Sequence, residues 1–252
     1  MSLKFSIITV SYNSEKTIAK TIESVLNQEK LPENPFETEY LIIDGRSSDK
    51  TVEVAESYRA EMKSKGIDYK IVSEPDAGIY DAMNKGIGLA SGDIIGIINS
   101  DDFYEPCALM VAAGIFKKTD CDLMFANVRI HKKDGSTFIK KAKLRRFQTS
   151  RDWNHPTMFV KASVYKKYPF RQKCVYDDYG CYLRMRRAGV NIVTADKVLA
   201  NFKMGGASNG GGFKETIKRI RDRYLFCYRM NGYGRFYLFE CIFTETLKMI
   251  LG

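Results

Sequence analysis

The stretch "GDIIGIINSDDFYEP", residues 92–106, decides the fold. Its first half is apolar at consecutive positions, which is typical of a strand buried on both faces within a parallel sheet. The strand ends abruptly in Asn99-Ser100-Asp101-Asp102. Two adjacent carboxylates raise each other's pKa, so the pair must face water, a helix N-terminus or a divalent metal.

The residues before this stretch alternate between strand and helix patterns. We predict strands at 4–10, 39–44, 69–72 and 93–99, and helices at 14–28 (capped by Ser14), 47–66 (closed by Gly66) and 79–90. Apolar strands separated by helices indicate an α/β fold. Its central sheet is expected to be mainly parallel, with helices on both faces.

The residues after this stretch follow a less regular pattern. We predict a helix to about residue 118, a strand at 122–128 and a hairpin at 128–141 with Asp134-Gly135 at its turn. A glycine-rich loop follows at 204–213. Two basic, aromatic helices then extend to the C-terminus, and no repeat or low-complexity linker interrupts the chain.

The composition is that of a globular protein with an excess of cations. Of the 252 residues, 44% are hydrophobic and 28% are charged, and the net charge of +10 favours nucleotides, nucleic acid or an anionic membrane as partners. The six cysteines form no CxxC pair, so we expect reduced thiols rather than a zinc site or disulfides. The N-terminus does not read as a signal peptide, and no apolar run of about 18 residues predicts a membrane span.

Polar side chains follow the predicted strands at their carboxyl ends. Strand one ends in "TVSYN" at 9–13, strand two in Asp44-Gly45 and strand four in 99–102, while Asp76 follows strand three. Ligands of open α/β sheets bind at this edge, so we predict one shared cleft there. The serines next to these strand ends fit helix caps instead.

The predicted cleft lacks the usual phosphate-binding loops. The first turn, "TVSYNSEKT", has no glycine fingerprint of a dinucleotide site, and no GxxxxGK[ST] loop occurs in the chain. A Mg²⁺ or Mn²⁺ ion held by one or two carboxylates and by the substrate's phosphates is another solution. Asp101 and Asp102 fit that role, and a helix cap with a solvated turn before Pro106 is the structural alternative.

Four segments, spread over about residues 4–190, form a pattern that is specific because of their order and spacing. They are "FSIITVSYNSEKTIAKTIESVLNQ", "EYLIIDGRSSDKTVEVAESY", "SEPDAGIYDAMNKGIGLASGDIIGIINSDDFY" and, more weakly, "DDYGCYLRMRRAG". Together they resemble the family 2 glycosyltransferases, inverting enzymes of GT-A fold (nucleotide-diphospho-sugar transferase type) that build bacterial surface polysaccharides. The resemblance implies a catalytic domain at 1–212, with a donor-binding half at about 1–105 and an acceptor half at about 106–212. A C-terminal helical extension follows at 213–252.

The resemblance also implies roles for individual residues. Contacts to the nucleotide donor are assigned to one set: Thr9, Ser11, Tyr12, Asn13, Asp44, Asp76, Asn84, Asn99 and Ser100. "NSDD" stands at the family's DxD motif, which assigns a Mn²⁺ or Mg²⁺ ion to Asp101 with Asp102 in support. Asp178, beside Asp177, stands where the family has its general base. A helix N-cap with a partner for the helix dipole is the structural alternative for this pair. "GGAS" at 205–208 resembles the loop that closes over the donor.

Two positions depart from the family pattern. Asn99 stands where the DxD motif begins with Asp, so its contact to ribose or to a metal-bound water is weaker or passes to Ser100. Met83 stands where many members carry Arg, so the identity of the donor does not carry over.

The leading hypothesis is a metal-dependent, hexosyltransferase-like enzyme. It would transfer a sugar from a nucleotide-diphosphate donor, a UDP-sugar, to a hydroxyl of a glycan or lipid-linked acceptor in polysaccharide biosynthesis. The metal would stabilise the leaving diphosphate, and Asp178 would accept the proton of the hydroxyl. A sugar nucleotidyltransferase is one alternative, although strand one lacks the glycine-rich loop of that class. A nucleic-acid-binding module is the other, but no motif of that class occurs and we expect no nucleic-acid partner.

Three further features bear on the acceptor and on localisation. His155 and Trp153, in "DWNHPTMF", are candidates for the acceptor site, with packing in the core as the alternative. The C-terminal segment interleaves basic and aromatic residues at helical spacing, which fits either packed helices or a surface that docks on an anionic membrane. We therefore expect a cytoplasmic protein, either free or peripheral on the inner face of the plasma membrane.

Overall fold

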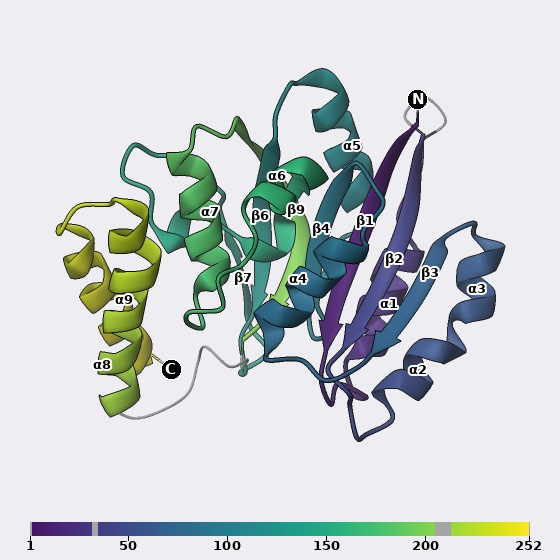
Figure 1. The fold of residues 1–252 in the computed structure, drawn as a ribbon, viewed down its shortest axis with the longest axis horizontal. Helices are drawn as coiled ribbons and strands as arrows, with labels where there is room; N and C mark the ends of the chain where they lie inside the picture. Colours follow the sequence, from purple (N-terminus) through teal and green to yellow (C-terminus); the bar gives the residue numbers. More distant parts are fainter. Residues whose placement is uncertain (1, 32–34, 205–212, 252) are drawn as a thin grey trace.

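In the computed structural model, which describes residues 2–31, 35–204 and 213–251, strands and helices alternate through the first half of the chain (Figure 1). The strands are β1 (Leu3–Ser11), β2 (Phe36–Asp44), β3 (Asp68–Ser73), β4 (Ile94–Asn99), β5 (Phe103–Tyr104), β6 (Leu123–His131), β7 (Thr137–Lys140), β8 (Phe159–Lys161) and β9 (Ile192–Lys203). The α-helices are α1 (Ile18–Leu26), α2 (Thr51–Ser57), α3 (Arg59–Ser64), α4 (Ile79–Leu89), α5 (Ala108–Lys118), α6 (Ala162–Lys167), α7 (Asp177–Arg187), α8 (Phe213–Asp222) and α9 (Tyr237–Leu251). Short 3₁₀ turns lie at Ser150–Asp152, His155–Thr157 and Arg229–Asn231, and a π-helical turn at Arg223–Tyr228 follows α8.

One sheet joins the described strands in the order β3-β2-β1-β4-β8-β6-β9-β5, with β7 paired to β6. β1 pairs in parallel with β2 and β4, and β2 pairs in parallel with β3, so the first half of the sheet is parallel throughout. β8 runs antiparallel between β4 and β6, and β9 runs parallel beside β6. The predicted α/β fold with a mainly parallel sheet is confirmed, and antiparallel strands enter only its second half.

Alternate residues of β1 enter two separate cores. Phe5 and Ile7 pack with α1, α2, α3 and α5 on one face of the sheet. Ile8 and Val10 pack with α4, α6 and α7 on the other face, which Figure 1 shows in front of the sheet. Burial on both faces explains why the strand sequences are apolar at consecutive positions.

Two helices differ from the sequence prediction. α1 begins at Ile18 rather than at Ser14, because the Ser14 hydroxyl bonds to the hydroxyl of Ser100 (2.8 Å) instead of capping the helix. The single helix predicted at 47–66 is two helices, α2 and α3, which meet at Tyr58. At the start of α1, the contact of Ser14 with Ser100, after the distant strand β4, outweighs the local helix pattern.

Two predicted turns have the backbone conformation that favours glycine. Gly135 connects β6 to β7 with φ +84°, and Gly66 follows α3 with φ +67°. Glycine reaches positive φ without the steric cost of a Cβ. The predicted hairpin and the predicted end of the second helical segment are therefore confirmed.

The C-terminal helices, yellow in Figure 1, pack beside α7 at the end of the molecule away from β3. Tyr228, Tyr237 and Cys241 share a core with Tyr179 of α7. The stretch 205–212, which includes "GGAS", lies outside the described residues. Among the helices described, none combines the length and apolar character needed to cross a membrane. The predicted boundary between the catalytic domain and the extension stays a prediction.

The close packing of α4 on the sheet gives a stability prediction. A Cβ at Gly86 would lie 2.6 Å from Cγ2 of Ile8 and 3.2 Å from Cγ1 of Ile43. We expect Gly86→Ala to lower the free energy of unfolding by about 1–3 kcal/mol, because a packed core does not accept added atoms without strain. Urea denaturation measures the change.

Gly88 of the same helix is the matched control. Apart from its chain neighbours and the backbone of its own helix, no described residue has an atom within 4 Å of a Cβ added there, so Gly88→Ala should leave stability unchanged or raise it by up to about 1 kcal/mol. Similar destabilisation by both substitutions would contradict the packing explanation.

Candidate active site

The carboxyl ends of β1 and β4 open into a cavity of about 1170 Å³, hereafter the first cavity. Its walls come from four segments that are far apart in the sequence: 10–17, 45–49, 75–79 and 99–101. These segments follow β1, β2, β3 and β4. The structure therefore brings the polar strand ends identified in the sequence to one rim.

Asp44 organises this rim. Its carboxylate accepts hydrogen bonds from the hydroxyls of Ser11 (3.1 Å), Ser47 (2.5 Å) and Ser73 (2.7 Å), and from the backbone N–H of Ser47 (2.9 Å). Asp44 is 1% exposed and is not a wall of the first cavity. It joins the ends of β1, β2 and β3, and its contact to a donor stays a prediction.

Tyr12 and Asp76 both approach Gly45. A Cβ at Gly45 would lie 2.6 Å from Oδ2 of Asp76 and 3.4 Å from the ring of Tyr12. The Tyr12 ring is largely exposed, and Asp76 Oδ1 accepts the N–H of Gly78 (2.8 Å). An aromatic ring and a carboxylate thus border the same space, an arrangement that suits a planar base with neighbouring hydroxyl groups.

Two further predicted residues order the walls of the first cavity. Asn13, at φ +49°, accepts the N–H of Ser48 at its Oδ1 (2.9 Å) and donates its own N–H to the hydroxyl of Ser47 (2.8 Å). The hydroxyls of Ser100 and Ser14 lie 2.8 Å apart, which ties the turn after β4 to the turn after β1. The turns after β1, β2 and β4 therefore support one another.

The two carboxylates after β4 point to different environments. Asp101 lines the first cavity together with Asn99, whereas Asp102 is 1% exposed. Asp102 Oδ1 accepts the N–H of Lys203 in β9 (3.1 Å), and its buried Oδ2 has no partner among the described residues. Burial, aided by the charge of Asp101, raises the pKa of Asp102 well above its usual range. Asp101 is thus the carboxylate of the pair that reaches the cavity.

The surroundings of Asp101 offer few protein ligands to a bound cation among the described residues. Burial raises the pKa of Asp101, and the nearby charge of Lys203 opposes this only in part. In the described part of the chain, no group of three or more acidic, histidine or cysteine side chains could hold a metal. A Mg²⁺ or Mn²⁺ ion would therefore depend on Asp101 together with phosphate oxygens of a ligand. Any support from Asp102 would be indirect, through the turn that it anchors to β9.

A second cavity, of about 390 Å³, adjoins the first. The two cavities share four lining residues, including Asn99 and Asp101. Other walls of the second cavity are His155 and Asp178. Asp101 from the first half of the chain and Asp178 from the second half therefore border the same space.

Asp178 has two hydrogen-bond donors and a neutral imidazole near it. Its Oδ1 accepts the hydroxyl of Tyr80 (3.2 Å) and the N–H of Tyr179 (2.7 Å). Burial lowers the pKa of His155, and the charge of Asp178 opposes this only in part. The His155 ring is therefore neutral near pH 7, and its buried Nε2 has no partner among the described residues.

Asp177 supports a loop instead of lining the cavity. It is 3% exposed, and its Oδ2 accepts the backbone N–H groups of Arg171 and Gln172. Gln172 has φ +58°, a conformation that is uncommon for a residue with a side chain. Asp177 thus fixes the loop before α7, while burial raises the pKa of its carboxyl.

Three predicted residues have structural partners. Thr9 is fully buried, with its hydroxyl 3.0 Å from that of Tyr40. Asn84 donates to the carbonyl of Phe170 (2.9 Å) and accepts its N–H (3.0 Å), which ties α4 to the loop after α6. Trp153 is 5% exposed and packs with the core, and it also lines a smaller cavity together with His155 and Asp178, so its acceptor role stays a prediction. Neither Thr9 nor Asn84 borders the first or second cavity.

Sequence reasoning misses other residues of the second cavity. Tyr80, Gln172 and Lys173 line it. Tyr80 follows "SEPDAG" at the start of a predicted helix, so its position near the rim could have been inferred from the sequence. Gln172 and Lys173 belong to an irregular loop without a periodic pattern, and no local signal identifies them.

The chain is similar to known proteins over most of its length. A family model described as Glycosyl transferase family 2 matches residues 6–173. A PGL/p-HBAD biosynthesis glycosyltransferase of Mycobacterium tuberculosis is 27% identical over 225 residues, which cover 86% of this chain and 83% of that protein.

Solved structures share the fold. TarS 1–349 of Staphylococcus aureus in complex with UDP-GlcNAc matches with a TM-score of 0.63 and 17% identity, over 98% of this chain and 72% of that chain. This chain spans 61% of the same TarS fragment solved with UDP. The mannosyltransferase PcManGT from Pyrobaculum calidifontis, in complex with GDP-Man and Mn²⁺, matches with a TM-score of 0.69 and 14% identity, over 100% and 75% of the two chains. At these identities the likeness concerns the fold alone, and it confirms the expected GT-A fold.

The burial of Asp102 predicts a pH-dependent stability. A carboxyl whose pKa is raised in the folded state favours folding when protonated, and this contribution is lost as the pH rises from the ordinary value of 3.8 through the raised value. We expect Asp102→Asn to raise the free energy of unfolding at pH 8 by about 1 kcal/mol or more, because a buried charge is removed. Urea denaturation in the presence of a chelator measures it.

The same comparison at pH 4 is the control. At pH 4 the carboxyl is protonated in the folded chain and about half protonated in the unfolded chain, whose pKa is near the ordinary value of 3.8, so the gain should be much smaller than at pH 8. A gain of equal size at pH 4 and pH 8 would contradict the assignment of the effect to ionisation.

Proposed function

The chain belongs to glycosyl transferase family 2, and we propose that it transfers a sugar from a UDP-sugar to an acceptor hydroxyl with inversion at the anomeric carbon. The acceptor would be a glycan or a lipid-linked sugar of a polysaccharide pathway. The observation that carries the proposal is the second cavity, where Asp101 and Asp178 border the same space. Membership of the family disfavours the sugar nucleotidyltransferase and nucleic-acid hypotheses.

The first cavity would bind the nucleotide. The exposed ring of Tyr12 would stack on the base, and Asp76 would accept hydrogen bonds from ribose hydroxyls. TarS was solved with UDP-GlcNAc, and its sequence is 28% identical to this chain over 127 residues, which favours UDP as the nucleotide. Those residues are only 21% of that protein, so TarS does not indicate the sugar or the acceptor of this chain.

Asp101 would hold the diphosphate end of the donor. It lies where the first and second cavities meet, and it would bind a Mn²⁺ or Mg²⁺ ion together with the phosphates. When bound, the ion supplies positive charge that stabilises the leaving diphosphate. Asn99 borders the same junction, and its buried Oδ1 has no partner among the described residues. It would accept a hydrogen bond from the ribose or from a water molecule.

Asp178 would act as the general base. In a single displacement, the acceptor oxygen forms the new bond to the anomeric carbon while the bond to the diphosphate oxygen breaks, and the proton passes to the carboxylate of Asp178. The hydroxyl of Tyr80, which is shared between the carbonyl of Val175 (2.9 Å) and Asp178 Oδ1 (3.2 Å), would help to orient the carboxylate. Proton transfer to a positioned base contributes about 10²–10⁴-fold to such reactions. Asp177 would contribute indirectly, because it fixes the loop before α7.

We further propose that the C-terminal extension docks on an anionic membrane. Three of its acidic residues, Asp222, Glu240 and Glu245, are at most 8% exposed. Its exposed cations are Lys214, Lys218, Arg221, Arg229 and Arg235. Its most exposed aromatic rings include those of Phe213, Phe236, Phe239 and Phe243. Exposed cations and exposed aromatic rings thus occur together in the extension, a composition typical of helices that lie on lipid headgroups.

A donor screen tests the catalytic proposal. The full chain is incubated with Mn²⁺ and a panel of UDP- and GDP-sugars, and release of the nucleoside diphosphate is measured. We expect Asp101→Asn to reduce release by at least about 100-fold, because the cation site is lost. Asp178→Asn should bind donor like the wild type and lose at least about 100-fold in turnover, because the base is lost.

Asp120→Asn is the matched control. The side chain of Asp120 is fully exposed, and its ion-pair partner, Lys161, lines none of the cavities described above. The turnover of Asp120→Asn should equal that of the wild type. Release that needs no divalent ion and is unchanged in Asp101→Asn would contradict the metal assignment. Full turnover in Asp178→Asn would move the base to another residue.

Sedimentation with lipid vesicles tests the membrane proposal. The chain should bind vesicles that contain phosphatidylglycerol, and high salt should weaken this binding because charge attraction is screened. Replacement of Phe236, Phe239 and Phe243 by Ser should reduce binding by at least about tenfold, whereas Phe138→Ser in the β6–β7 hairpin should not. Equal binding to vesicles of phosphatidylcholine alone would contradict the proposal.

A further inference from the structure

A third cavity, of about 280 Å³, adjoins the second cavity on the side of the C-terminal extension. It shares His155 and Asp178 with the second cavity and no residue with the first. Its other walls include residues of the 150–156 segment and, from the extension, Arg223 and Thr244. The volume is several times the roughly 30 Å³ occupied by one water molecule and is close to the lower end of ligand pockets, about 300 Å³.

Three residues of this cavity carry buried polar atoms without a partner among the described residues. The atoms are Oδ1 of Asn154, Nε2 of His155 and Nε of Arg223, and each residue is at most 8% exposed. A buried polar group without a hydrogen bond costs about 1–3 kcal/mol, so three around one cavity indicate a polar occupant. They comprise one acceptor, one donor and one imidazole nitrogen. Hydroxyl groups, which both donate and accept, satisfy all three.

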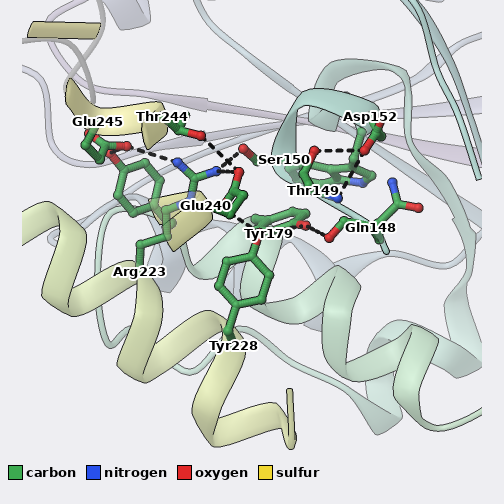
Figure 2. Close-up of polar contacts among 12 residues, drawn as sticks. Gln148, Thr149, Ser150, Asp152, Tyr179, Arg223, Tyr228, Glu240, Thr244 and Glu245 are labelled. Carbon is green, nitrogen blue, oxygen red and sulfur yellow. Dashed lines mark hydrogen bonds and ion pairs between the residues drawn. The ribbon is translucent and has the colours of Figure 1, made fainter. Parts of the chain in front are cut away.

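The position of Arg223 is fixed by a buried cluster of charged and polar groups (Figure 2). Its guanidinium donates from Nη1 to Glu245 (3.0 Å) and from Nη2 to the hydroxyl of Ser150, and Glu240 lies 3.4 Å from Nη2. Glu240 also accepts the hydroxyl of Thr244 (3.0 Å). The cluster thus joins the extension to the 150–156 segment, the two elements that face each other across the cavity.

Such a cluster is weak evidence for stability. The cost of removing charges from water is comparable to the attraction regained, and apolar replacements often stabilise a protein equally well. Recognition of a ligand in the third cavity gives a better reason for the cluster. The cluster uses both Nη atoms of Arg223 and leaves its Nε–H without a partner among the described residues, in a side chain that lines the same cavity as Asp178.

We infer that the C-terminal extension completes the acceptor site, and that the third cavity binds a hydroxyl-bearing sugar ring of the acceptor. The inference rests on the proposed function and deepens it. Arg223 and Asn154 select the hydroxyl pattern of the ring, and Thr244 sets its space. The order of the cavities then places the acceptor hydroxyl at Asp178, between the ring in the third cavity and the donor held at Asp101.

A cavity-filling variant tests this inference. Thr244→Phe introduces a ring into the third cavity, whereas Thr246→Phe adds the same ring in the same helix at a residue that does not line it. The probes are methyl glycopyranosides of glucose, galactose, mannose and N-acetylglucosamine, and binding to the full chain is measured by saturation-transfer NMR. We expect at least one probe to bind the wild type and Thr246→Phe, and to lose at least about tenfold in affinity with Thr244→Phe.

Two companion measurements keep the outcomes distinct. Thermal melting shows whether each variant is folded. If Thr244→Phe does not fold, Thr244→Leu, which fills less of the third cavity, replaces it, and a weaker loss of probe affinity is then expected. Donor hydrolysis is measured for the wild type and Thr246→Phe, and its absence in both would overturn the proposed function. If donors are hydrolysed, unchanged probe binding in a folded Thr244 variant overturns the inference, as does the failure of every probe to bind the wild type.

Discussion

The parallel register of β3, β2, β1 and β4 is the constraint on which the rest of the site depends. Backbone pairing places Ser73 beside Asp44, Asp44 beside Ser11, and Val10 beside Asn99. Each strand can therefore be apolar along its length and still contribute its last polar residue to a common rim. A shift of one residue would turn these side chains to the opposite face and would separate Asp44 from the hydroxyls that it joins.

The charges around the first cavity support the proposed role of a cation in binding a diphosphate. The chain carries a net charge of +10, yet four carboxylates and two cations line this cavity: Glu15, Asp49, Asp76 and Asp101, with Lys16 and Arg46. A diphosphate placed there without a metal would meet mostly like charge. The raised pKa of Asp101 points the same way, because burial makes its ionised form costly until a positive charge compensates it.

The sequence was sufficient to predict the edge at which the polar residues gather, because strand periodicity and strand ends are local features. It was not sufficient to predict the partner of each side chain. Asp101 and Asp102 are adjacent, yet one reaches the cavity and the other bonds to Lys203, a hundred residues away. Asn84 likewise bonds to Phe170 in a later loop. Such pairings depend on how the second half of the chain folds back, which no local pattern specifies.

In the C-terminal extension, the burial of acidic side chains affects both the inner cluster around Arg223 and the exposed surface of the helices. Glu240 and Glu245 are buried, where both pair with Arg223 and Glu245 also pairs with Arg219, and Arg223 forms part of the wall of the third cavity. Among the described residues of the extension, the burial of these acids leaves Glu215 as the exposed acid, beside five exposed cations and several exposed aromatic rings. Reversing this arrangement would bury unpaired cations and expose acids, and would weaken both surfaces at once. The inner cluster and the outer surface are therefore consequences of a single arrangement, so a change in one is expected to affect the other.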